Sequence, residues 1–106
     1  MTCAVKICGL TSSEAIDAAV EAGADMVGFV FFPPSPRSLT IEAAAALAKR
    51  VPDHVNRVAL SVDADNALLA AIAMEVRPDM MQLHGQETPE RVTEVRELWQ
   101  LPVMKA

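Results

Sequence analysis

The sequence predicts an α/β fold in which parallel strands alternate with helices. Five short, mainly apolar segments recur at intervals of 22 to 31 residues, and they begin near Ala4, Met26, Arg57, Met80 and Val103. The segments between them carry helix-start signals and apolar residues at helical spacing. The second segment is apolar throughout, which is typical of a strand covered on both faces. This order, (βα)4β, favours a parallel sheet with right-handed crossovers.

The composition limits the class of protein. The 106 residues suffice for one hydrophobic core, so we expect a single unit over residues 1–106. The net charge of -5 argues against nucleic acid as a partner, because nucleic-acid-binding surfaces are basic. No apolar run approaches the ~20 residues of a membrane span, so we expect no membrane partner. No basic segment followed by a long apolar one opens the chain, and we therefore expect a cytoplasmic protein.

Two cysteines, Cys3 and Cys8, do not predict a disulfide. They differ by an odd number of positions in or beside one strand, so their side chains should point to opposite faces. The cysteine and histidine spacings typical of zinc sites are absent, and His54 and His84 are isolated. We therefore expect no metal.

The first strand is expected over Ala4–Cys8, where alternation places Lys6 on the same face as the terminal cysteine. Thr11-Ser12-Ser13-Glu14 has the spacing of a capping box, with the threonine as the cap. The helix that follows should end at Gly23, a favourable residue just beyond a helix.

The loop after the second strand, Phe32–Ser38, holds three prolines, which predict a shaped loop and not a further strand. Thr40 is expected to cap an alanine-rich helix that ends near Arg50. The third strand is expected over Arg57–Val62.

The second half of the chain continues the alternation. Asp65 should begin a third helix that ends before Arg77 and its following proline. The fourth strand is expected over Met80–Leu83. Thr88, followed by proline and glutamate, predicts the start of a fourth helix that reaches Trp99.

Two architectures fit this order of elements. A doubly wound open sheet of five strands has about this length. An eight-stranded βα barrel typically needs ~250 residues, so this chain would supply only half of one. Periodicity alone does not discriminate between them.

In either architecture the carboxyl ends of the strands share one edge, where Cys8, Arg37, Asp63 and His84 would converge. A cysteine at a strand end is more commonly a small buried hydrophobe than a catalyst. Two features favour catalysis here: the polar Lys6 on the same face, and a helix start whose dipole favours a thiolate.

The other candidates also have a structural and a functional interpretation. Arg37 is either a solvated charge or, held behind three prolines, a clamp for a carboxylate. His84 is more commonly a hydrogen-bonded structural residue, but Gln82 on the same face indicates a lined pocket. Asp63 is most simply a helix cap.

Several motifs resemble those of one enzyme family. Val5-Lys6-Ile7-Cys8-Gly9-Leu10-Thr11 is similar to the amino-terminal signature of the phosphoribosylanthranilate isomerase family. Ser35-Pro36-Arg37 resembles its Ser-x-Arg loop, and Gln82-Leu83-His84-Gly85 resembles its Gln-Leu-His-Gly strand end. The segment from Gly23 to Phe31 looks like the family's second strand, and Lys105-Ala106 resembles the start of the strand that follows the Gln-Leu-His-Gly strand end. The resemblance covers the whole chain in order.

The resemblance implies an α/β fold of the (βα)8 TIM-barrel type, of which this chain supplies about (βα)4 plus the start of strand five. It implies an isomerase of tryptophan biosynthesis that carries out an Amadori rearrangement. The small-molecule substrate would be N-(5-phosphoribosyl)anthranilate and the product 1-(2-carboxyphenylamino)-1-deoxyribulose 5-phosphate. No metal or organic cofactor is implied.

The resemblance also implies roles for individual residues. Cys8 would be the base that removes the proton from the sugar C2, and Arg37 would bind the anthranilate carboxylate. His84 would lie in the substrate pocket, and we expect Lys6 and Gln82 to line it as well. The family's general acid and phosphate-binding loops belong to later segments, so we expect the 106 residues alone to be inactive.

Two non-enzymatic alternatives stay open at this point. In a receiver-like signalling module with an open sheet, Asp63 and Lys105 would occupy the positions of the phospho-acceptor and the lysine. That module needs acidic residues after its first strand, where this chain has Cys8-Gly9. A half-barrel could also simply form a homo-oligomer through its open sheet edges. The barrel requires strand order 1-2-3-4-5 and the receiver 2-1-3-4-5.

Overall fold

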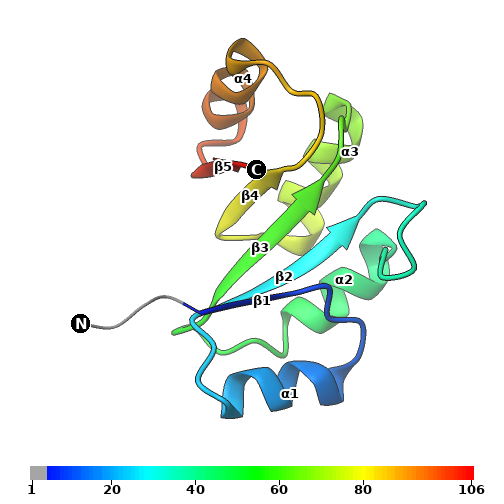
Figure 1. Ribbon diagram of the computed structural model, residues 1–106, viewed down its shortest axis with the longest axis vertical. Coiled ribbons are helices and arrows are strands. Elements are labelled where there is room, and N and C mark those ends of the chain that lie inside the picture. The colour runs from blue at the N-terminus through cyan, green and yellow to red at the C-terminus, as the bar shows by residue number, and fades with distance from the viewer. Residues whose placement is uncertain (1–4) are drawn as a thin grey trace.

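The computed structural model describes residues 5–106, which form a five-stranded parallel sheet flanked by helices (Figure 1). Cys3 and Ala4 lie outside the described residues, so the pairing of Cys3 and the start of the first strand stay predictions. The elements follow in the expected alternating order: β1 (Lys6–Cys8), α1 (Ser13–Glu21), β2 (Met26–Phe31), α2 (Ile41–Ala48), β3 (Asn56–Ser61), α3 (Asn66–Ala71), the π-helix η1 (Ile72–Val76), β4 (Met80–Leu83), α4 (Pro89–Trp99) and β5 (Val103–Lys105).

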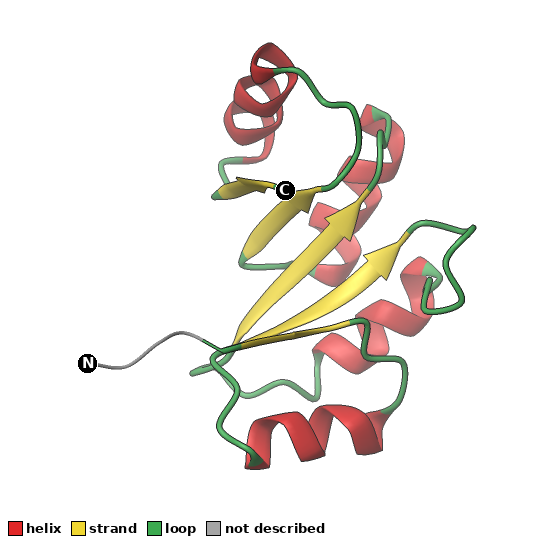
Figure 2. Ribbon diagram, in the orientation of Figure 1, coloured by secondary structure: helices red, strands yellow, loops and turns green. Residues whose placement is uncertain are grey.

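The strands lie in the order β1-β2-β3-β4-β5, and every neighbouring pair is parallel. This confirms the sequential order expected of a barrel, and it differs from the 2-1-3-4-5 order that a receiver-like module requires. The strands fan out into a curved sheet, and the helices lie on one side of it (Figure 2). The opposite, concave side carries no helix among the described residues.

The hydrophobic core fills the space between the sheet and its helices. Alternate residues of the strands, such as Val27 and Phe29 in β2, point into it because successive side chains leave opposite faces of a strand. The helices contribute apolar faces to the same cluster, among them Ile16, Leu69 and Val95, all at most 1% exposed. Within residues 5–106, no helix is both long and apolar enough to cross a membrane.

The start of α1 differs from the prediction. Ser12, not Thr11, is the cap, because its side-chain oxygen accepts a hydrogen bond from the Ala15 amide at 3.1 Å. The chain first turns through Gly9, with φ at 81°, and buries Leu10 before the helix begins. The helix therefore begins one residue later than the capping box requires, and the prediction of a capping box from Thr11 to Glu14 is wrong.

Other boundaries shift by one or two residues, as helix and strand ends commonly do. The second helix ends at Ala48 and the third strand runs over Asn56–Ser61, one residue earlier than predicted. The third helix ends before Arg77 as expected, but its last turn is the π-helix η1, in which the Arg77 amide donates to Ile72 O.

Asp63 is not a helix cap. Asp65 caps α3 by accepting a hydrogen bond from the Leu68 amide at 2.9 Å. Asp63 lies in the preceding loop with φ at 49°, a conformation that few residues other than glycine adopt. Its carboxylate turns toward the next βα loop.

Candidate active site

Cys8 lies at the carboxyl end of β1 and is half-buried against the backbone of β2. It pairs in register with Gly28, and a Cβ atom on that glycine would stand only 2.8 Å from Cys8 Sγ. The Gly28 carbonyl accepts hydrogen bonds from the Gly9 amide at 3.0 Å and the Leu10 amide at 3.3 Å. The chain therefore turns directly after the thiol, and the missing side chain of Gly28 makes the space that Cys8 occupies.

Arg37 reaches the same place from the loop between β2 and α2. The loop is shaped by short-range hydrogen bonds: the Phe32 amide donates to Ser38 Oγ at 3.0 Å, and the Arg37 amide to Ser35 Oγ at 3.2 Å. A Cβ atom on Gly9 would stand 2.6 Å from Arg37 Cδ. The arginine side chain therefore lies across Gly9, the residue that follows Cys8.

Lys6 and Gln82 meet on the concave face of the sheet. The Lys6 ammonium donates a hydrogen bond to Gln82 Oε1, although β1 and β4 are separated by two strands. In a flat sheet those strands would be about 14 Å apart, since neighbours lie roughly 4.8 Å apart. The contact is possible because the sheet curves, as a barrel wall does, and it supplies a polar partner for a half-buried ammonium.

His84 follows β4 at the same edge, with an exposed side chain. Its backbone amide donates to Ser61 O, the last residue of β3, at 2.9 Å. The structure thus brings Lys6 and Gln82 together, and it places Arg37 over Gly9, the residue that follows Cys8. His84 belongs instead to a third group, the loop between β4 and α4.

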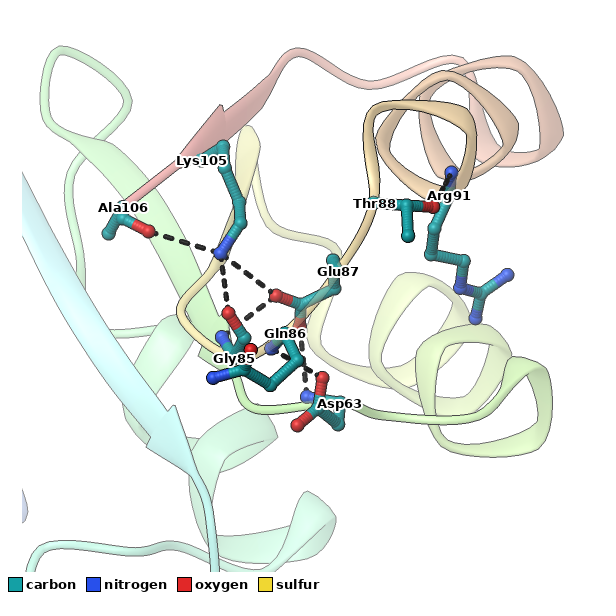
Figure 3. A network of polar contacts seen from close by, with 8 residues as sticks. All are labelled: Asp63, Gly85, Gln86, Glu87, Thr88, Arg91, Lys105 and Ala106. Atoms are coloured by element: carbon teal, nitrogen blue, oxygen red, sulfur yellow. Dashed lines mark hydrogen bonds and ion pairs between the residues drawn. The ribbon is translucent and has the colours of Figure 1, made fainter.

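That loop contains a buried carboxylate that the sequence analysis missed. The Glu87 side chain is only 4% exposed, and its two oxygens accept hydrogen bonds from the Gly85 amide at 2.8 Å and the Asp63 amide at 2.9 Å. Lys105 at the end of β5 lies 3.2 Å from the same carboxylate and donates to Gly85 O at 2.6 Å (Figure 3). A glutamate directly before a helix cap, in a loop that follows a strand end, is the only signal that the sequence offers for it.

The electrostatics of Glu87 follow from these contacts. Burial raises the pKa of the Glu87 carboxyl, but the surrounding backbone amides, that of Asp63 first, and the Lys105 ammonium lower it by more. The net pKa lies below the ordinary value of a glutamate, so the group is a carboxylate at neutral pH.

Cavities occur at both ends of the strands. A cavity of about 270 Å³ lies beside the Glu87 loop and is lined by Asp63, Gln86 and Arg91, among others. A cavity of about 550 Å³ lies between α2 and η1, beside Arg57 and Arg77. Those two arginines sit at the amino ends of β3 and β4, so the larger cavity is at the opposite edge of the sheet from Cys8.

A curved parallel sheet in sequential order, helices on its convex side and polar side chains gathered at the carboxyl ends of its strands define half of a βα barrel. Barrel proteins carry their chemistry at this edge. The class is therefore that of the βα-barrel proteins, and the comparisons with known proteins narrow it to one family.

The family model described as N-(5'-phosphoribosyl)anthranilate (PRA) isomerase matches residues 5–106, and the chain belongs to this family. It is 57% identical over 106 residues to the N-(5'-phosphoribosyl)anthranilate isomerase of Rhodopseudomonas palustris, covering all of this chain and 50% of that protein. It is 58% identical to the enzyme of the same name from Afipia carboxidovorans, covering 45% of that protein.

Solved structures give the same result. The phosphoribosyl anthranilate isomerase of Thermotoga maritima superposes with a TM-score of 0.92 at 36% identity, over 98% of this chain and 50% of that one. A second crystal structure of such an isomerase, in complex with reduced 1-(o-carboxyphenylamino)-1-deoxyribulose 5-phosphate, also gives a TM-score of 0.92 and 36% identity, over 98% of this chain and 53% of that one. The chain spans about half the length of the curated relatives it matches.

Proposed function

We propose that residues 1–106 act as the amino-terminal half of a phosphoribosylanthranilate isomerase. The complete protein would convert N-(5-phosphoribosyl)anthranilate to 1-(2-carboxyphenylamino)-1-deoxyribulose 5-phosphate in tryptophan biosynthesis, in the cytoplasm and without a metal or organic cofactor. The observation that carries the proposal is that Arg37 lies across Gly9, the residue that follows Cys8. A relative bound to the reduced form of this product supports the substrate class.

The reaction needs an acid and a base. The acid protonates the ribose ring oxygen, the bond between that oxygen and C1 breaks, and the nitrogen lone pair forms a C1=N iminium. Cys8, as the thiolate, then removes the proton from C2, and the C2–H electron pair forms the C1=C2 bond as the C1=N pair returns to nitrogen. The resulting enol tautomerises to the ketone. We assign the acid and the phosphate-binding loops to the other half of the barrel.

Arg37 is the residue that suits the anthranilate carboxylate. A guanidinium offers paired N–H donors in a plane, which match the two oxygens of a carboxylate. Its position over Gly9, the residue after Cys8, would hold the aromatic ring near the base while the sugar extends toward the interior of the barrel. His84, Lys6 and Gln82 would line that interior, where the bond between Lys6 and Gln82 keeps the ammonium paired.

The test is the Cys8→Ser substitution in the full-length protein. Serine keeps the shape of the side chain but is a far weaker acid, so its conjugate base is scarce at neutral pH. We expect kcat to fall by ~10² or more, the usual size of a general-base effect, with the folded structure unchanged by circular dichroism. Cys3→Ser is the matched control and should retain wild-type turnover. Near-normal turnover of the Cys8→Ser protein would remove Cys8 from the mechanism.

A further inference from the structure

We propose that Glu87, with Lys105 as its counter-ion, is a positioning residue that fixes the direction of the His84 side chain into the substrate pocket. This inference rests on the proposed function, because it takes His84 to contact the substrate. Glu87 lies in the same turn as His84, residues 84–87, and acts on it through the hydrogen bond that its carboxylate accepts from the Gly85 backbone amide (Figure 3).

The two backbone amides that flank the Cα atom of His84 are both held. The His84 amide donates to Ser61 O at 2.9 Å, which ties it to the end of β3. The next amide, that of Gly85, donates to Glu87 Oε1 at 2.8 Å. Since the two peptide planes on either side of a Cα atom fix its Cβ direction, these bonds fix the direction in which the His84 side chain leaves the backbone. The bond of the His84 amide is made to the backbone of β3, whereas the bond of the Gly85 amide depends on the Glu87 side chain alone.

Glu87 also joins the turn to its neighbours on both sides. Its second oxygen accepts from the Asp63 amide at 2.9 Å, and Asp63 Oδ1 in turn accepts from the Gln86 amide at 2.7 Å. Lys105 binds both the carboxylate and Gly85 O. Three successive strand ends, those of β3, β4 and β5, are thus connected through one carboxylate (Figure 3).

The packing leaves the turn little freedom to find another arrangement. A Cβ atom on Gly85 would stand 2.6 Å from Asp63 Cγ and 2.8 Å from the Asp63 backbone nitrogen, so the two loops are in direct contact. Asp63 is held at a positive φ of 49° by the same bonds. A strained residue of this kind persists only where its surroundings hold it, and here its amide is held by Glu87 and its carboxylate by the Gln86 amide.

A carboxylate is the group that suits this position. Each contact that Glu87 makes is with a donor: two backbone amides and one ammonium. A carboxylate only accepts, so it satisfies all three. A glutamine side chain would turn its NH2 group toward one of the amides or the ammonium and leave a buried donor without a partner. The Glu87→Gln substitution therefore keeps the size of the side chain and removes only its ability to accept from all three donors.

The experiment compares kcat and KM of full-length variants toward N-(5-phosphoribosyl)anthranilate. For Glu87→Gln we expect KM to rise about tenfold and kcat to stay within about twofold, since a substrate contact is misaligned while the base is untouched. Glu90→Gln is the matched control: it makes the same chemical change at an exposed position in the first turn of α4, and it should match the wild type.

The readout that separates positioning from general stability is the combination with His84→Ala. If Glu87 acts through His84, the KM of His84→Ala should not rise further when Glu87→Gln is added, because the imidazole is already gone. The Lys105→Met substitution repeats this comparison in a protein where Glu87 still accepts hydrogen bonds from the Gly85 and Asp63 amides. We expect it to raise KM by about threefold, again only when His84 is present.

The outcomes distinguish the two proposals. An unchanged KM in Glu87→Gln, or a KM increase that persists in full without His84, overturns the positioning role while leaving the isomerase assignment intact. An inactive wild-type protein overturns the proposed function and this inference with it. If Glu87→Gln does not fold, the Lys105→Met pair decides the matter by the same criterion.

Discussion

At the scale of single residues, the position of Cys8 depends on a side chain that is missing from its neighbour. Glycine inside a buried strand gives up packing area, and such a glycine commonly marks a close approach of another group. Gly28 fits this pattern, because Cys8 Sγ lies where its Cβ atom would crowd it. The thiol therefore rests against the backbone of β2, at the carboxyl end of β1.

Arg37 gives the first prediction at this scale. Arg37→Ala in the full-length protein should weaken the binding of a reduced product analogue by about 2–5 kcal/mol, the usual loss when one partner of a desolvated charge pair is removed. Isothermal titration of the analogue would measure it. Arg50→Ala is the control, because that arginine pairs with Asp17 on the surface and not with the pocket. Equal affinities of the Arg37→Ala and wild-type proteins would rule out the carboxylate clamp.

The sequence predicted some of these residues and missed others for a physical reason. Alternation along a strand and the shared edge of parallel strands indicated the common face of Lys6 and Gln82, and their hydrogen bond confirms it. The role of Glu87 was not predictable in this way. Its partner Asp63 is 24 residues distant, and nothing in the spacing says that two loops will touch. Such contacts depend on how the curved sheet brings its strand ends together, and local sequence patterns do not encode that arrangement.

At the scale of elements, the start of α1 shows that the turn before a helix can move its cap by one residue from the position that a sequence motif predicts. Both Thr11 and Ser12 precede α1, and the capping-box spacing favours Thr11. The turn through Gly9 delays the helix by one residue, so Ser12 reaches the Ala15 amide. The caps of the other helices, Thr40, Asp65 and Thr88, lie where the sequence predicted them.

This geometry predicts unequal effects of two neighbouring substitutions. Ser12→Ala should lower the free energy of unfolding by about 1 kcal/mol, since it leaves the Ala15 amide without its cap. Thr11→Ala should change it by less than about 0.5 kcal/mol, because Thr11 is exposed and makes no cap. Denaturant unfolding of the full-length variants, followed by circular dichroism, measures both. A larger loss for Thr11→Ala would mean that the capping box exists after all.

The π-helix η1 is an element that the pattern could not reveal. Residues 68–76 are mostly apolar, so an α-helix continued to Arg77 fits the sequence equally well. The structure widens the last turn, and both Ile72 and Val76 stay buried, at 0% and 4% exposed. The distinction between an α turn and a π turn is made by tertiary packing, and single-sequence periodicity is too coarse to report it.

At the scale of the whole molecule, the sheet has two free edges. Among the described residues, β1 pairs only with β2 and β5 only with β4. The concave face bears Lys6 and Gln82, where a complete barrel would pack opposing side chains. The order of elements predicted a parallel sheet with right-handed crossovers, which both a barrel half and an open sheet have. The observed strand order, the curvature of the sheet and the family discriminate between the two.

The last prediction concerns residues 1–106 on their own. Unpaired strand edges readily pair with other chains, so the isolated segment should form homo-oligomers through β1 and β5 or be only marginally stable. It should lack isomerase activity, because the acid and the phosphate loops are assigned to the other half. Light scattering and an isomerase assay on the purified segment test both points. Activity regained on mixing with the complementary carboxyl-terminal half would support the assignment of the acid and the phosphate loops to that half. A stable monomer that turns over the substrate would instead show that the 106 residues hold an acid and a phosphate site of their own.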